Sequence, residues 1–173
     1  MNINSVPALI TAITSALLGA FVYLRGSKLT PNRTWALLSF FVALWSFSVV
    51  MIMNAPNERM GLLWARMIYF GAIPIPATLL HFTLSYLQKT REKKLLIVLA
   101  YVLAGLFLSL NCTAFIIEGV VPHEAFKYFG VPGQTYFLFV LVWIGTVGWC
   151  FYEMIKAYRT ARMIQKNQIK YLL

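Results

Sequence analysis

The residue types best suited to chemistry in this chain stand together in one apolar segment, 61–87. An arginine, two prolines and a histidine interrupt its aliphatic and aromatic residues: Arg66, Pro74, Pro76 and His81. Each proline removes a backbone N–H donor and clashes with the preceding helical turn, so the carbonyls of Phe70 and Ala72 lose their usual partners. At membrane depth such a kink is tolerated only where protein or a water-filled cavity satisfies the exposed backbone.

His81 is the ionisable residue on one side of this kink, and an ionisable group at membrane depth is by default a functional candidate. Glu153, at the end of the last apolar segment, is the carboxylate that we expect to pair with it, and such a pair titrates with pH or binds a ligand. The alternative is a neutral His81, hydrogen-bonded to a neighbouring helix. One histidine and one glutamate are too few for a metal site, so we expect neither a metal nor another cofactor.

Arg66 has two interpretations. Its long stem can carry the guanidinium back to the lipid headgroups, or the side chain points into the helix bundle and clamps an anionic or carbonyl ligand. Arg66 and His81 are 15 positions apart, which places them within about 60° on one helical face. This spacing favours a polar seam that both residues share.

The segment 114–135 is the longest connection between apolar segments and differs from the others in composition. It holds Glu118, His123, Glu124 and Lys127 among phenylalanines and a tyrosine. We take it as the most ligand-like surface, with His123 as its candidate binding residue. The alternative is an amphipathic lid that lies among the headgroups, with its aromatic rings as interfacial anchors.

The elements that must position these residues are transmembrane helices. The 173 residues are 60% hydrophobic and only 12% charged, with a mean hydropathy of +0.73, and one soluble core cannot bury that much apolar surface. Five segments reach the roughly 20 apolar residues that a span requires: 6–24, 35–53, 61–87, 95–113 and 136–155. We therefore predict an all-α integral membrane protein, a bundle of five transmembrane helices over residues 1–173, with the third helix kinked.

The basic residues predict how this bundle is oriented. Of the 15 Lys and Arg residues, twelve fall after the first, third and fifth spans, and only Arg59 and Lys127 fall in the opposite loops. Basic loops stay in the cytoplasm, so the N-terminus is expected outside and a basic helix, 156–171, inside. Because the cations lie between apolar runs, their expected partners are anionic lipid headgroups and not nucleic acid.

Nothing in the composition indicates an enzyme. Aspartate is absent and acidic residues number five, which leaves little for paired-carboxylate chemistry. Serine or cysteine triads, zinc-binding helices and phosphate-binding loops are missing or wrongly spaced. We predict a protein without catalytic activity of its own.

Four stretches carry a resemblance to a known family. They are NRTWALLSFFVALWSF (32–47), RMIYFGAIPIPATLLHFTLSY (66–86), GQTYFLF (133–139) and QKNQIKYLL (165–173). In order and spacing they resemble the seven-transmembrane N-terminal sensory domain of bacterial histidine kinases. The resemblance implies sensing without catalysis, with the helix after the last span feeding a cytoplasmic PAS, kinase or cyclase domain. The chain stops where a sixth helix would begin, so we expect a truncation, a gene fragment or a stand-alone relic.

The resulting hypothesis is a signal-input domain in the bacterial inner membrane. Its bundle, kinked at Pro74 and Pro76, binds an apolar or amphipathic signal and shifts the fifth helix, which relays the signal to a cytoplasmic transmitter. A homodimer is the expected assembly. Two alternatives remain open: a small transporter or substrate-binding subunit, for which a broken mid-membrane helix is typical, and an accessory subunit of a larger membrane complex.

Overall fold

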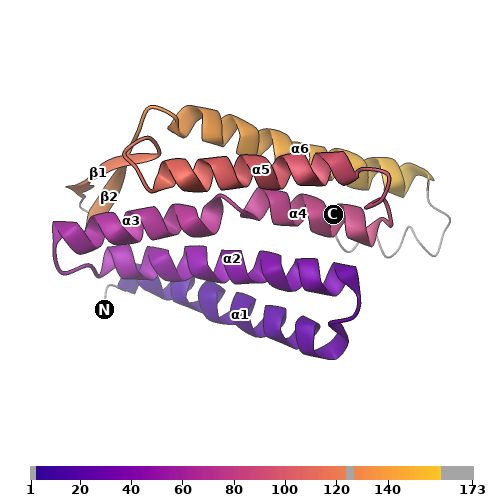
Figure 1. Ribbon diagram of the computed structural model, residues 1–173. Coiled ribbons are helices and arrows are strands. Elements are labelled where there is room, and N and C mark those ends of the chain that lie inside the picture. The colour runs from indigo at the N-terminus through magenta and orange to yellow at the C-terminus, as the bar shows by residue number, and fades with distance from the viewer. Residues whose placement is uncertain (1–2, 124–126, 161–173) are drawn as a thin grey trace.

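Five helical segments in the computed structural model, which describes residues 3–123 and 127–160, are long and apolar enough to cross a bilayer (Figure 1). They are Ile3–Gly26, Thr30–Met53, Glu58–Tyr86, Lys94–Asn111 and Tyr136–Arg159. The five predicted spans are therefore confirmed, with ends that differ by a few residues. The first segment includes a short 3-10 turn, η1 (Ile3–Ser5), ahead of its α-helix.

The first two spans, α1 (Val6–Gly26) and α2 (Thr30–Met53), form a closely packed antiparallel pair. Pro7 and Pro31 stand in the first turn of each helix, where a missing N–H costs nothing. A Cβ added at Gly19 would lie 2.7 Å from the Cβ of Ser39. Small residues at this crossing therefore set how closely the two backbones approach.

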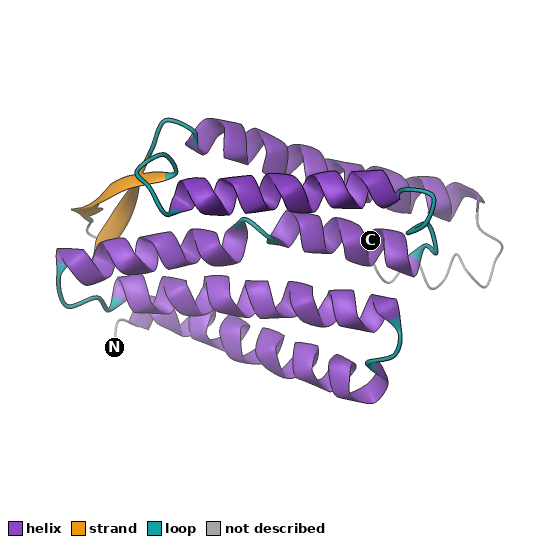
Figure 2. Ribbon diagram, viewed as in Figure 1, coloured by secondary structure: helices purple, strands orange, loops and turns teal. Residues whose placement is uncertain are grey.

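The third span consists of two helices placed end to end, α3 (Glu58–Ala72) and α4 (Ile75–Tyr86). Asn57 caps the start of α3, its side chain accepting a 3.0 Å hydrogen bond from the backbone N of Met60. Pro74 is the N-cap residue of α4 and Pro76 lies in its first turn. Figure 2 shows the interruption as a short loop at mid-bundle, where the sequence predicts the kink.

The fourth and fifth spans, α5 (Lys94–Asn111) and α6 (Tyr136–Thr160), are joined by a β-hairpin that the sequence analysis did not predict. Strand β1 (Ile117–Pro122) pairs antiparallel with β2 (Tyr128–Pro132). Ile116 and Ile117 are buried against the bundle, and a Cβ on Gly61 of α3 would meet the ring of Tyr128 at 2.8 Å. The β-branched residues of 116–121 favour this strand. The buried isoleucines and the ring of Tyr128 place the hairpin against α3.

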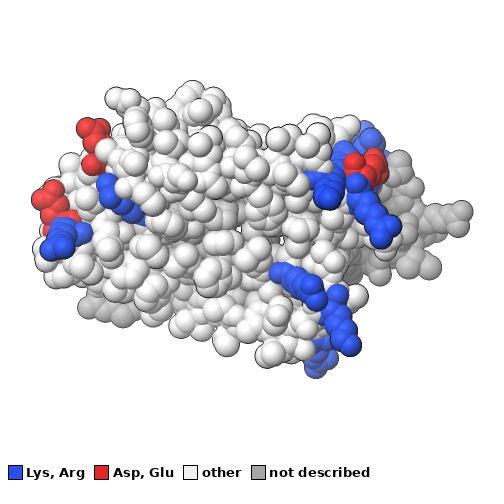
Figure 3. Space-filling model, viewed as in Figure 1, with Lys and Arg blue, Asp and Glu red and all other residues white. Residues whose placement is uncertain are grey.

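Charged side chains gather at the two ends of the bundle and leave an uncharged belt between them (Figure 3). We call the end that carries the α1–α2 turn, the α4–α5 turn and the end of α6 the basic end, and the other the hairpin end. The predicted basic helix 156–171 is described only as far as Thr160, where α6 ends; positions 161–171 lie outside the described residues.

Candidate functional site

Hydrogen bonds satisfy backbone carbonyls on both sides of the break between α3 and α4. The carbonyl of Ala72 accepts a 3.3 Å hydrogen bond from the indole Nε1 of Trp143 on α6. On the other side of the break, both the backbone N and the side-chain Oγ1 of Thr78 donate to the carbonyl of Pro74, each at 3.0 Å. Protein groups thus satisfy the carbonyls of Ala72 and Pro74, and one of the donors belongs to another span.

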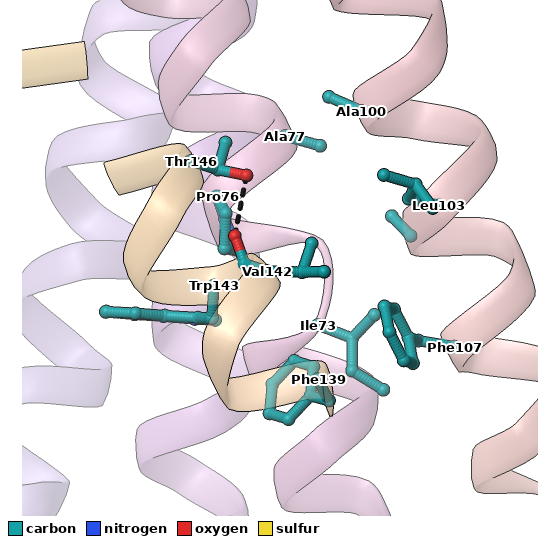
Figure 4. A pocket seen from close by; sticks show the side chains of 11 residues that line it. Ile73, Pro76, Ala77, Ala100, Leu103, Phe107, Phe139, Val142, Trp143 and Thr146 are labelled. Carbon is teal, nitrogen blue, oxygen red and sulfur yellow. Dashed lines mark hydrogen bonds between the residues drawn. The ribbon is translucent and has the colours of Figure 1, made fainter. Parts of the chain in front are cut away.

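A small apolar cavity of about 20 Å³ lies beside this break. Figure 4 shows side chains from the break itself, from α4, and from α5 and α6 around it. Phe107 of α5 and Phe139 of α6 meet at one end with ring centroids 5.7 Å apart. Thr146 contributes no free hydroxyl, because its Oγ1 donates to the carbonyl of Val142 at 2.8 Å. The cavity has room for about one water-sized group and an apolar lining.

Replacing Trp143 by phenylalanine tests the contact that bridges α6 to the break. We expect Trp143→Phe to lower the free energy of unfolding by about 0.5–1.5 kcal/mol, the usual net value of one hydrogen bond, because the Ala72 carbonyl loses its donor. Trp45→Phe on α2 is the matched control, since that tryptophan is 42% exposed. Thermal unfolding in detergent, followed by circular dichroism, measures both; equal losses would contradict the proposed role of the indole.

His81 does not pair with Glu153, so that expectation was wrong. Its Nδ1 lies 3.2 Å from the hydroxyl of Tyr101 on α5, and the two rings meet edge to face. The side chain therefore contacts α5, whereas the carboxylate of Glu153 on α6 is paired with lysines. The contact matches the alternative interpretation, a histidine hydrogen-bonded to a neighbouring helix.

Glu153 binds two lysines of the turn between α4 and α5 instead. Its carboxylate is fully buried; Lys89 Nζ lies 2.9 Å from Oε2, and Lys93 Nζ contacts Oε1. Lys93 also lies over the ring of Trp149, 5.2 Å from its centroid. We call Glu153, Lys89 and Lys93 the Glu153 clamp. It ties the basic end of α6 to the α4–α5 turn.

Neither lysine of this clamp was predicted, because a basic residue in a loop indicates orientation in the membrane and does not identify a contact. A usable signal was present. Only two acidic residues, Glu92 and Glu153, are expected at the basic end among its many cations, and only Glu153 lies within an apolar segment. A lone carboxylate within an apolar helix requires a cationic partner. The choice between His81 and the lysines depends on helix rotation, which spacing along the chain does not reveal.

Arg66 lies half-buried on α3, near the hairpin end. Its backbone carbonyl accepts a 3.0 Å hydrogen bond from Nδ2 of Asn111 on α5, and its Nε is buried without a hydrogen-bond partner in the described part of the chain. Arg66 and His81 thus both lie against α5. Ala104 and Phe107 separate their two contacts along that helix, so the expected polar seam is not continuous.

His123 lies on the exposed outer part of the hairpin, and its ring centroid is 5.7 Å from that of Phe129. The candidate residues therefore fall in separate places: the proline break, the His81–Tyr101 contact, the Glu153 clamp and the hairpin end. Within residues 3–123 and 127–160, no group of three His, Cys, Asp or Glu side chains is placed to hold a metal ion. The break, with its cavity and its link to α6, is the candidate for ligand binding.

Comparison with protein families gives a match that covers nearly the whole chain. A family model described as the N-terminal 7TM region of histidine kinase matches residues 7–173. The matched range includes the last four spans in full, the first from residue 7 onward, the break and the Glu153 clamp. The comparisons with curated proteins and with solved structures give no match.

Proposed function

The chain belongs to the family of N-terminal seven-transmembrane regions of histidine kinases, and from this premise we propose that it binds an apolar or amphipathic signal beside the proline break and relays it through α6. The family is a membrane sensory input region and is not itself catalytic. The hydrogen bond between Trp143 and Ala72 supports signal binding at the break. It joins the broken span to α6, the helix that we propose carries the output.

The attachment of α6 supports its role as the moving element. Its main helix partner is α4, whereas its backbone approaches α5 at few points. Two of the polar contacts of α6 lie at different depths of the bundle: Trp143 contacts the break at mid-bundle, and Glu153 contacts the lysines at the basic end. Both contacts belong to one continuous helix. A ligand that separates α6 from the break therefore also strains the Glu153 clamp.

The size of the cavity supports coupling between binding and movement. With about 20 Å³, the present conformation admits no acyl chain or quinone ring, so such a molecule must push α5 and α6 apart. A ligand shifts a conformational equilibrium only by its difference in affinity for the two states. A closed cavity that must open to accept a signal provides that difference.

We place this module in the bacterial inner membrane with its N-terminus outside. Within the described residues, the cations expected in the cytoplasm do share the basic end (Figure 3), which is the pattern of the positive-inside rule. On this orientation the cavity lies at mid-membrane and the Glu153 clamp at the cytoplasmic face, next to the transmitter that we propose α6 addresses. A homodimer stays a prediction.

Ligand binding can be tested by thermal shift on the purified chain, with long-chain acyl compounds, quinones and phospholipids as the probes. We expect at least one to raise the unfolding temperature and to change Trp143 emission. Ala104→Leu fills the cavity from α5, where Ala104 is buried, so the stabilisation should disappear in that variant. Gly105→Ala is the control, since no described atom lies within 4 Å of an added Cβ there.

Stabilisation that persists unchanged in Ala104→Leu would place the ligand elsewhere, and no stabilisation by any probe would count against an apolar signal. Neither result affects membership of the family, which rests on the match over residues 7–173.

A further inference from the structure

A groove lies between α1 and α2, and no residue of the broken span lines it. It encloses about 290 Å³, roughly twice the ~150 Å³ of an apolar cavity that holds benzene. Small residues of both helices form its floor: Ala16, Gly19, Ala20, Ala36 and Ala43. Tyr23 and Phe40, both about half exposed, border it.

The basic end of this groove carries cations that lack acidic partners. Arg25, Lys28 and Arg33 all lie at the α1–α2 turn, and the first acidic residue of the chain is Glu58. None of these three cations forms a salt bridge within the described residues. Figure 3 shows Lys and Arg side chains at this corner of the molecule with no Asp or Glu beside them. Their charge is available to an anion from outside the chain.

Arg33 connects this charge to the groove. It lies three residues before Ala36 and seven before Phe40, so all three share one face of α2. The residue is exposed, and its Nε donates to the carbonyl of Ser27. This bond orients the guanidinium and leaves its terminal N–H groups for a phosphate, an anion that arginine can bind with two hydrogen bonds.

We propose that the α1–α2 groove binds an anionic phospholipid, with one acyl chain in the groove and the phosphate held by Arg33 together with Lys28. Hydrophobicity does not favour one apolar surface over another within a membrane. The acyl chain is therefore held by packing, and the lipid headgroup is selected by charge. The inference is independent of the signal-binding proposal, because it concerns other helices.

A second copy of the chain fits this groove less well. Two copies in one membrane share the same orientation, and a symmetric contact joins identical surfaces. Such a contact would bring two sets of unpaired cations together at the basic end. Charge complementarity therefore favours a lipid anion as the occupant.

The headgroup contact can be tested by native mass spectrometry of the full chain. The protein is taken from nanodiscs with equal amounts of phosphatidylglycerol and phosphatidylcholine of identical acyl chains, and bound lipids are counted. We expect preferential retention of phosphatidylglycerol, and a loss of about fivefold in that preference for Arg33→Gln, the effect of one cation near an anionic surface. Arg91→Gln, which removes an exposed cation from the other turn, should leave the preference unchanged.

The acyl-chain contact needs a second variant. Ala20→Leu fills the groove from an exposed position of α1, so the fold is retained while binding of both lipids falls; Leu17→Ala, on the same helix outside the groove, should have no effect. Equal retention of phosphatidylglycerol by the unmodified chain, Arg33→Gln and Ala20→Leu would overturn the proposal. A changed monomer–dimer equilibrium in Ala20→Leu with unchanged bound lipid would overturn it in favour of a second copy.

Discussion

Glu153→Gln is expected to lower the free energy of unfolding by about 3 kcal/mol, near the lower end of the roughly 3–5 kcal/mol measured when one partner of a buried ion pair is removed. The carboxylate is fully buried, while Lys89 and Lys93 keep 26% and 22% of their side-chain surface exposed. The substitution leaves two partly buried ammonium groups without a counter-charge. Their remaining access to water is the reason for expecting the lower value.

The measurement is chemical or thermal unfolding in detergent, with Glu92→Gln as the control. Glu92 stands in the same turn as the lysines, is exposed, and forms no salt bridge within the described residues, so its loss should change stability by less than about 0.5 kcal/mol. A loss as large for Glu92→Gln as for Glu153→Gln would show that total charge matters at this end and the clamp does not.

A triple variant separates the two lysines from the rest of the helix contact. When Lys89, Lys93 and Glu153 are all replaced by methionine, no buried charge is left uncompensated, and such replacements are often neutral. We expect most of the lost stability to return. In this variant α6 would still pack on the α4–α5 turn, but without the polar contact that we propose is strained when a ligand binds. The variant would therefore test whether signalling requires that contact.

Gly71→Ala is expected to cost about 2–3 kcal/mol of stability, toward the upper end of the usual range for overpacking. A Cβ at this position of α3 would lie 2.6 Å from the backbone N of Trp45 and 2.7 Å from its Cα. Backbone atoms cannot rotate out of the way, so α2 and α3 must separate next to the break. The unfolding midpoint of the variant measures the cost.

Gly145→Ala on α6 is the matched control for this substitution. No described atom lies within 4 Å of an added Cβ there, and alanine is favoured over glycine inside a helix by up to about 1 kcal/mol. The control should therefore be neutral or slightly stabilising. If Gly71→Ala proved as harmless as Gly145→Ala, the close approach of α2 and α3 would not be required for the fold.

The spans, their order and the position of the break could be read directly from the sequence. A helix that crosses a bilayer needs about 20 apolar residues whatever its neighbours are, and a proline lacks its N–H in any surroundings. Both are properties of a short stretch of chain. The break at Pro74 and the loss of a partner for Ala72 were therefore predictable, although the structure shows a full interruption rather than a bend.

The hairpin at 117–132 shows where local patterns were insufficient. Its residues alternate little and include aromatic and charged side chains, which are also typical of an interfacial lid. The paired strands fit against α3, where Ile117 is buried and the ring of Tyr128 lies beside Gly61. That fit depends on a helix more than 40 positions away in the sequence.

Side-chain partners between helices depended on the tertiary structure in the same way. Trp143 as the donor to Ala72, Tyr101 beside His81 and the lysines around Glu153 all follow from how each helix is rotated and how far it is shifted along its neighbours. Packing sets rotation and shift, and many pairings are compatible with one order of apolar segments. Hydropathy and proline chemistry act along the chain, whereas these contacts act across it, so the spans and the break could be predicted from residue order and the polar contacts of α6 could not.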